Sequence, residues 1–163
     1  GAGDGNTSEL FGEGWQWTGI DIKPSNEKVI FGDAHNLQFN DSEFDVVYCI
    51  SVLEHTEYYD SILKEFKRVL KPGGRFVLTH PFYPSNDPSV TSPYSKDKLS
   101  NFACTIGIKD YARRLIQKGL RMYYTHSHDK VNSIGSIQTG HVIAFVKTTE
   151  RVQDDLFEHF LED

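Results

Sequence analysis

The first five residues of the chain, Gly-Ala-Gly-Asp-Gly, have the composition of a loop that holds a nucleotide. Gly1, Gly3 and Gly5 stand at alternate positions, and glycine lets backbone N–H groups approach a bound ligand closely. Residues 6–11 can begin a helix whose N-terminus faces the same place. Such a loop normally leaves the carboxyl end of a buried parallel strand. The loop therefore indicates a cofactor site.

Two carboxylates follow the loop at positions that suit a nucleoside. Asp21 ends a predicted strand, where it could accept hydrogen bonds from both ribose hydroxyls. Asp33 follows the next predicted strand and could accept from an adenine amino group, while the Ala34 backbone contacts the ring. Each aspartate also has a purely structural interpretation as a turn residue. The nicotinamide pattern G-x-G-x-x-G/A does not fit, because Asn6 stands where it needs glycine or alanine.

Four histidines are candidates for chemistry. His55 and His80 each follow a predicted strand at the end where an acceptor would bind, and a near-neutral histidine suits proton removal. Their alternative role is a hydrogen bond at a helix start or a proline turn. His126 and His128 alternate after another predicted strand and could bind a metal, as in a metal-dependent hydrolase. That pattern lacks a further histidine after Asp129.

The hydrophobic pattern alternates between strands and helices. Strands are predicted at residues 17–21, 28–32, 44–50, 75–79, 120–124 and 141–146, and helices at residues 59–70 and 108–118. The run 44–50 is continuously apolar, which is typical of a parallel strand covered on both faces, so we expect it to be central. No helix fits between the first two strands. This order predicts an α/β domain.

Composition favours one domain and a small-molecule site. The chain has 163 residues, of which 38% are hydrophobic, and this is too short for two comfortable domains. A net charge of −6 argues against broad nucleic-acid binding. No apolar run is long enough to span a bilayer and no leader is visible, so a cytoplasmic protein without a membrane partner is expected. Cys49 and Cys104 lack metal-ligand spacing, and we expect packed thiols.

Two further segments stand out. Residues 81–102 are rich in proline and aromatic residues and leave the carboxyl end of a strand, which favours a substrate lid. Residues 149–163 predict an acidic C-terminal helix with one apolar side, which could dock on its own domain or on a partner.

Taken together, these segments resemble the class I S-adenosylmethionine-dependent methyltransferases, specifically the small type 11 group. The resemblance extends over residues 1–147. It rests on G-A-G-D-G at 1–5, G-I-D-I at 19–22, G-D-A at 32–34, F-D-V-V at 44–47, V-L-E-H at 52–55 and F-K-R-V-L-K-P-G-G-R-F-V-L at 66–78.

The resemblance implies a Rossmann-like sheet of strand order 3-2-1-4-5-7-6, with its last strand antiparallel. S-adenosylmethionine would lie across the carboxyl ends of the first strands. The implied cofactor-binding residues are Gly1, Gly3 and Gly5 beside the methionine portion, Asp21 at the ribose, Asp33 at the adenine, and Ile22, Ala34, Ile50, Ser51 and Val52 around them.

The sequence departs from this family in three places. The family's first strand is absent, so we expect a single domain over residues 1–163 that is incomplete at its N-terminus, with two unpaired strand edges. The helix between the second and third strands is also absent. Some relatives bind a metal through E-x-x-E-H, but Ser51 replaces the first glutamate, so no metal is expected.

These observations lead to one expected function and two alternatives to it. We expect S-adenosylmethionine-dependent methyl transfer to a small-molecule or sugar-like acceptor, with His55 and His80 as candidate bases. One alternative is a non-catalytic methyltransferase-like interaction module, and the hydrolase above is a remote one. A homo-oligomer could cover the gap left by the missing strand.

Overall fold

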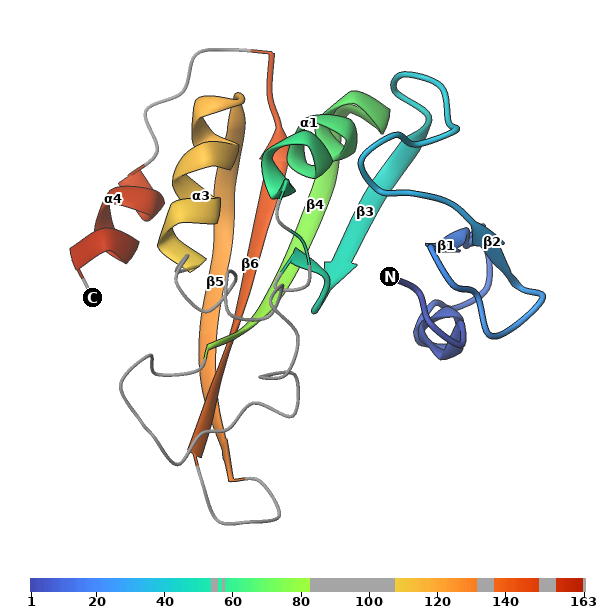
Figure 1. Ribbon diagram of the computed structural model, residues 1–163. Coiled ribbons are helices and arrows are strands. Elements are labelled where there is room, and N and C mark those ends of the chain that lie inside the picture. Colours follow the sequence, from blue (N-terminus) through green and yellow to red (C-terminus); the bar gives the residue numbers. More distant parts are fainter. Residues whose placement is uncertain (54–55, 57, 83–107, 132–136, 150–154, 163) are drawn as a thin grey trace.

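The computed structural model describes residues 1–163 except 54–55, 57, 83–107, 132–136, 150–154 and 163, which are the thin grey segments of Figure 1. Its elements in chain order are the 3-10 helix η1 (Asn6–Leu10), strands β1 (Gly19–Asp21), β2 (Val29–Phe31) and β3 (Phe44–Ile50), helix α1 (Tyr59–Val69), strand β4 (Leu70–Phe82), helix α3 (Ile108–Gln117), strands β5 (Leu120–Val131) and β6 (Ile137–Lys147), and helix α4 (Asp155–Glu162).

The strands form two sheets that lie next to each other (Figure 1). β1 and β2 pair in parallel, and the other four strands follow the order β3-β4-β6-β5. β3 is parallel to β4, whereas β6 is antiparallel to both of its neighbours. The expected α/β fold with an antiparallel last strand is therefore confirmed, and its strand order is the family order without the first strand.

The glycine loop stands between the two sheets. The Ala2 N–H donates to the Ile20 carbonyl in β1 at 2.8 Å, and Gly1 lies against the Val52 side chain just after β3. Figure 1 shows the N-terminus between the tip of β3 and the β1–β2 pair. Within the described residues, no strand pairs with the facing edges of β1 and β3.

β3 corrects one expectation. Its bounds are those predicted, but it is an edge strand and not a central one. Its side chains at Tyr48 and Ile50 are 47% and 39% exposed, so it is not covered on both faces. The bounds of a strand follow from its apolar residues, but its position in the sheet depends on its neighbours.

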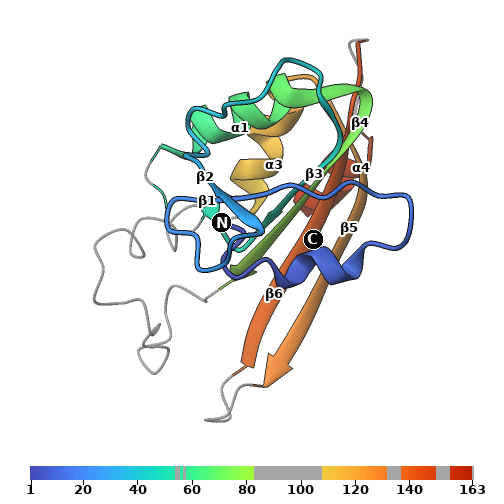
Figure 2. The same cartoon turned by 90° about the vertical axis from the view of Figure 1, so that its right-hand side faces the viewer.

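Two helices cover one face of the four-stranded sheet. Ile62, Leu63 and Phe66 recur on one side of α1 and are buried. The N-terminal segment lies toward the opposite face, where Phe11 packs on Tyr48 with ring centroids 5.1 Å apart. Figure 2 shows η1 on that side of the sheet, away from α1 and α3.

The end of α1 differs slightly from the predicted one. The helix ends at Val69, and β4 begins at once with Leu70. Leu70 lies opposite Phe44 while Arg75 lies opposite Val46, so residues 71–74 form an irregularity in the strand. The predicted helix stop at Lys-Pro-Gly-Gly is therefore one residue late, and the strand begins earlier than residue 75.

The last two strands are longer than predicted, because they form an antiparallel hairpin. Their pairing runs from Leu120 opposite Lys147 to Val131 opposite Ile137. Polar residues in the outer half of β5 do not produce an apolar strand pattern, yet the backbone pairing continues through them. α4 lies beside α3 and β5 (Figure 1), and its Leu156 packs against the hydrophobic core. In the described part of the chain, no helix has the length and apolarity to cross a membrane.

Candidate functional site

The glycine loop adopts conformations that favour glycine. Gly3 and Gly5 have φ angles of 55° and 77°, in the left-handed region. A Cβ atom on Gly1 would lie 2.6 Å from a Val52 methyl carbon, so the loop passes very close to the residue that follows β3. The helix expected after the loop is only the five-residue 3-10 helix η1. The loop is thus shaped by backbone conformation and close packing.

Asp21 connects the glycine loop to the end of β1. Its Oδ2 accepts the Gly3 N–H at 2.9 Å, and its Oδ1 accepts the Lys23 N–H at 2.8 Å. These two bonds lower the pKa of the Asp21 carboxyl below its ordinary value, the Lys23 contact contributing most. The turn-capping interpretation of Asp21 therefore applies, and the same carboxylate also anchors the loop. Each oxygen keeps a lone pair that a hydroxyl could use.

Asp33 follows β2 and is held by its neighbour His35. Oδ1 of Asp33 accepts the His35 backbone N–H at 2.9 Å and lies 2.7 Å from its Nδ1. The backbone bond and then the ring contact lower the pKa of the Asp33 carboxyl. The other ring nitrogen of His35, Nε2, lies 3.0 Å from Oγ1 of Thr56 in the segment after β3. The predicted adenine carboxylate is thus tied to a second strand end.

The residues after β3 form the side of the site that faces the loop. Ser51 has a φ angle of 50°, which is uncommon for a residue with a side chain, and its N–H donates to Oγ1 of Thr79 at 3.1 Å. Strained backbone of this kind is frequent at binding sites. Ile50 is partly exposed beside it, whereas Ile22 is 71% exposed after β1. The structure brings the predicted residues 50–52 to the glycine loop through Val52.

An open pocket adjoins Asp33. It has a volume of about 780 Å³ and is lined by Asp33, His35, the start of α1 from Tyr58 to Ser61, and Arg114 of α3. The Arg114 guanidinium lies 5.1 Å from the centroid of the Tyr59 ring, within cation–π distance. The pocket therefore has aromatic and charged walls next to the predicted adenine position.

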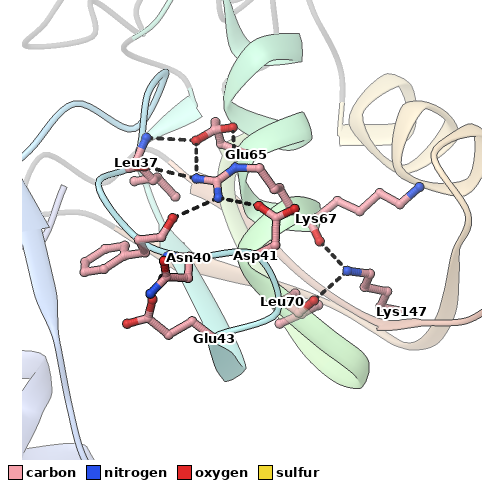
Figure 3. Close-up of polar contacts among 10 residues, drawn as sticks. Leu37, Asn40, Asp41, Glu43, Glu65, Lys67, Leu70 and Lys147 are labelled. Carbon is pink, nitrogen blue, oxygen red and sulfur yellow. Dashed lines mark hydrogen bonds and ion pairs between the residues drawn. The ribbon is translucent and has the colours of Figure 1, made fainter.

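Arg68 and Glu65 support the segment that carries Asp33, and the sequence did not reveal this role. The Arg68 guanidinium donates to both Glu65 oxygens at 2.9 and 2.8 Å, to Asp41 at 2.8 Å, and to the carbonyls of Leu37 and Phe39 at 3.0 and 2.8 Å. Figure 3 shows Leu37, Asp41 and Glu65 around this group. The contact with Arg68 lowers the pKa of Glu65, and Glu65 in turn raises that of Arg68. The β2–β3 segment is thus fixed to α1.

Lys147, at the end of β6, contacts the C-terminal end of α1. Its Nζ donates to the carbonyls of Lys67 and Leu70 at 2.8 and 2.6 Å, where α1 ends (Figure 3). The last carbonyls of a helix lack partners within it, and a lysine can supply them. Burial lowers the pKa of Lys147, more than the nearby charge of Lys67 does. β6 therefore helps to hold α1 in place.

Known proteins share this arrangement of loop and strands. Residues 1–78, from the glycine loop to β4, match the family model of a methyltransferase domain. These residues, slightly under half of the chain, are similar to the class I S-adenosylmethionine-dependent methyltransferases. The matched residues contain the loop, Asp21, Asp33 and residues 50–52.

Two curated relatives and one solved structure show how far the likeness extends. Sterol 4-C-methyltransferase of Caenorhabditis elegans is 36% identical over 46% of this chain and 20% of its own length. The mitochondrial 2-methoxy-6-polyprenyl-1,4-benzoquinol methylase of Rattus norvegicus is 40% identical over 40% of this chain and 20% of its own length. A Methanosarcina mazei methyltransferase structure shares the fold, with 24% identity, a TM-score of 0.69, and coverage of 92% of this chain and 91% of its own. The chain thus spans about a fifth of the two curated relatives.

The residues present fit the cofactor of this family. The glycine loop carries no side chain at Gly1, Gly3 and Gly5, so a ligand can approach its backbone closely. Asp21 and Asp33 stand at the carboxyl ends of neighbouring parallel strands, and both have lowered pKa values, so they are ionised acceptors near neutral pH. Ribose hydroxyls and an adenine amino group are donors that match them.

The predicted histidines are placed only in part. His55 lies outside the described residues. The backbone of His80 lies inside β4, opposite His141, and not after the strand as predicted, because β4 continues to Phe82. His126 and His128 likewise lie within β5, because the hairpin extends this strand. In the described ranges, no three side chains of the histidine, cysteine or acidic type are grouped as a metal site.

Most of the predicted lid, and the second cysteine, lie outside the residues that the structure describes. Residues 83–107, which contain most of the lid and Cys104, lie outside the described residues. Cys49 is buried in β3. His35, Thr56 and Arg68 were missed because each acts through a contact between distant segments. In the sequence, His35 and Thr56 only flank recognised motifs, and Arg68 stands inside one without any sign of its contacts.

Proposed function

We propose that this chain binds S-adenosylmethionine and transfers its methyl group to a small-molecule acceptor. The observation that carries the proposal is the attachment of the glycine loop to Asp21, with Asp33 at the end of the adjacent parallel strand. These three features supply a close backbone approach and two ionised acceptors on the same edge of the sheet. The match of residues 1–78 to the model of a methyltransferase domain supports the choice of cofactor.

Each part of the site has a defined task in this proposal. Gly1, Gly3 and Gly5 leave room for the methionine portion beside the backbone of the loop, Asp21 accepts from the ribose, and Asp33 accepts from the adenine. Ile22, Ala34, Ile50, Ser51 and Val52 complete the walls around them. When bound, the cofactor supplies a methyl group on an activated sulfonium. The chain then needs only to orient an acceptor and exclude water.

An acceptor whose reacting atom carries a proton also needs a base to remove that proton. We propose His55 or His80 for this task, since both lie close in sequence to the ends of β3 and β4. The imidazole would take the proton from the acceptor atom as the new bond to carbon forms. An acceptor with a free lone pair at neutral pH does not require this step.

The acceptor proposed is an uncharged or weakly charged small molecule. A net charge of −6 disfavours polyanions such as nucleic acids. The two relatives named above are a sterol and a benzoquinol methyltransferase, so ring-containing apolar molecules should be included beside sugar-like ones. The family model ends at residue 78, before the segments expected to contact the acceptor, so the comparison bears mainly on the cofactor half.

The test is transfer of a labelled methyl group. The chain is incubated with methyl-labelled S-adenosylmethionine and separate panels of sterols, quinols, sugars and transfer RNA, and products are separated by mass. We expect label in a small-molecule panel and a loss of that label in the Asp21→Ala variant. An Asp45→Ala variant, which removes an exposed ion pair with Lys71, is the matched control and should keep the activity. Label in transfer RNA alone would contradict the proposed acceptor class.

A second candidate is a non-catalytic interaction module. The facing edges of β1 and β3 are unpaired within the described residues, and such edges pair readily with another strand. A homo-oligomer that pairs these edges is the simplest partner. Light scattering across a concentration series tests this, because a dimer that dissociates on dilution and does not transfer label favours the module. A monomer that transfers label contradicts it.

A further inference from the structure

Asp33, His35 and Thr56 form a continuous chain of contacts across two strand ends. Oδ1 of Asp33 lies 2.7 Å from Nδ1 of His35, and Nε2 of His35 lies 3.0 Å from Oγ1 of Thr56. Both contacts fall in the range of ordinary hydrogen bonds. These two contacts therefore link the loop after β2 to the segment after β3.

The imidazole can satisfy both contacts in its neutral form. A neutral ring has one donor and one acceptor, so Nδ1–H donates to Asp33 while Nε2 accepts from the Thr56 hydroxyl. This tautomer follows from the partners, because a carboxylate can only accept. The backbone N–H of His35 donates to the same oxygen of Asp33 at 2.9 Å. Both described contacts of the Asp33 carboxylate are thus made by the same oxygen, Oδ1.

The two contacts that His35 makes with Oδ1 of Asp33 determine the direction of Oδ2. The Asp33 side chain is 57% exposed, and its two described side-chain contacts both involve Oδ1. With Oδ1 fixed, the second oxygen has one direction, and an aspartate without this contact could rotate about its terminal torsion, which has broad preferences. The Tyr58 ring packs edge-on to the imidazole at 6.5 Å and limits its movement further.

We propose that His35 is a positioning residue that holds the Asp33 carboxylate ready to receive the adenine amino group, with Thr56 fixing the imidazole. The inference rests on the proposed cofactor site and adds to it a determinant of base selectivity. An amino group donates to the fixed Oδ2, whereas the oxo group of hypoxanthine presents an acceptor to a carboxylate. The site should therefore prefer the adenosyl over the inosyl compound, and this preference should depend on His35.

The test compares binding of S-adenosylhomocysteine and S-inosylhomocysteine by calorimetry. His35→Ala should weaken binding of the adenosyl compound about fivefold to tenfold, the loss that follows from one positioning hydrogen bond. It should also reduce the preference for adenosyl over inosyl. Thr56→Val should act in the same direction but less strongly. His35→Asn, whose amide can donate to Asp33, should recover most of the preference.

A double-mutant cycle separates positioning from general damage. If His35 acts through Asp33, His35→Ala should have little further effect in an Asp33→Ala background. Arg121→Ala, which changes an exposed residue on β5 outside the proposed cofactor site, is the control and should bind as the unmodified chain does. Melting curves of all variants should stay close together, since the His35 side chain is itself partly exposed.

The outcomes distinguish this inference from the proposed function. Loss of affinity and selectivity with a non-additive cycle supports it. Binding by the unmodified chain, together with full affinity and selectivity in His35→Ala, overturns the positioning role and leaves the proposed function intact. Additive losses in the cycle also overturn it. An unmodified chain that binds neither compound overturns both.

Discussion

The backbone N–H of Gly3 donates a 2.9 Å hydrogen bond to Oδ2 of Asp21, and this contact joins the glycine loop to the carboxyl end of β1. Gly3 itself has a left-handed φ of 55°. The side chain proposed to bind the ribose therefore also shapes the loop proposed to bind the methionine portion. Two parts of the site depend on one carboxylate.

Replacing Asp21 with alanine should affect affinity strongly. The variant loses a charged acceptor for the ribose and the anchor of the loop, so affinity for S-adenosylhomocysteine should fall about tenfold to a hundredfold. Calorimetric titration measures this. Asp21→Asn keeps one acceptor oxygen, so its affinity for S-adenosylhomocysteine should decrease less. Unchanged affinity in Asp21→Ala would show that the ribose assignment is wrong.

Removing Arg68 should destabilise the fold. Arg68→Ala breaks contacts with two carboxylates and two carbonyls, leaving the largely buried Glu65 without its cation. The free energy of unfolding should decrease by about 2 to 3 kcal/mol, as measured by urea denaturation. The exposed Arg121 on β5 is the matched control, and Arg121→Ala should change stability by less than about 0.5 kcal/mol. Equal effects of the two substitutions would contradict the role of this network.

Acid should weaken the same network through Glu65. The contact with Arg68 lowers the pKa of Glu65 from its ordinary value of 4.5, so the carboxylate is favoured by folding. The stabilisation is complete above pH 4.5 and is lost as the pH falls through the lower pKa of the folded state. Urea titrations from about pH 7 to about pH 3 should show a smaller loss of stability in Glu65→Gln than in the unmodified chain. Parallel losses in both would exclude Glu65 as a major contributor.

Gly5 should not tolerate a side chain. Its φ is 77°, and an added Cβ would lie 3.1 Å from a methyl carbon of Val29. Gly5→Ala should therefore lower the free energy of unfolding by about 1 to 2 kcal/mol. At Gly12 an added Cβ meets nothing within 4 Å, so Gly12→Ala is a suitable control. A stability for Gly5→Ala equal to that of Gly12→Ala would argue against the loop conformation described above.

Much of the fold follows from hydrophobic periodicity. The buried residues of α1 recur at three- and four-residue steps, and the predicted helix over 59–70 differs from Tyr59–Val69 by one residue. The β3 bounds match because Phe44–Ile50 is an apolar run interrupted only by Asp45. The extent of β5 and β6 could not be predicted in this way. Their outer residues are joined by backbone pairing, which does not depend on apolar side chains.

The site could be predicted only where a local motif marks it. Asp21 ends β1 and Asp33 closely follows β2, and a position at or after the end of a strand is visible in the sequence. His35 and Thr56 are 21 residues apart, and their contact depends on how two loops fold toward each other. Arg68 reaches Leu37 across 31 residues for the same reason. Contacts between loops are set by the tertiary fold, so the supporting residues become apparent only in the structure.

The central claim is that the glycine loop, Asp21 and Asp33 bind one S-adenosylmethionine-type ligand. Calorimetric titration of the unmodified chain with S-adenosylhomocysteine tests it most directly, with an Asp21→Ala/Asp33→Ala double variant measured in parallel. We predict saturable binding of one ligand per chain that is abolished in the double variant, with melting curves that rise on ligand addition only for the unmodified chain. No heat and no thermal shift with the unmodified chain, or equal binding by the double variant, would contradict the account.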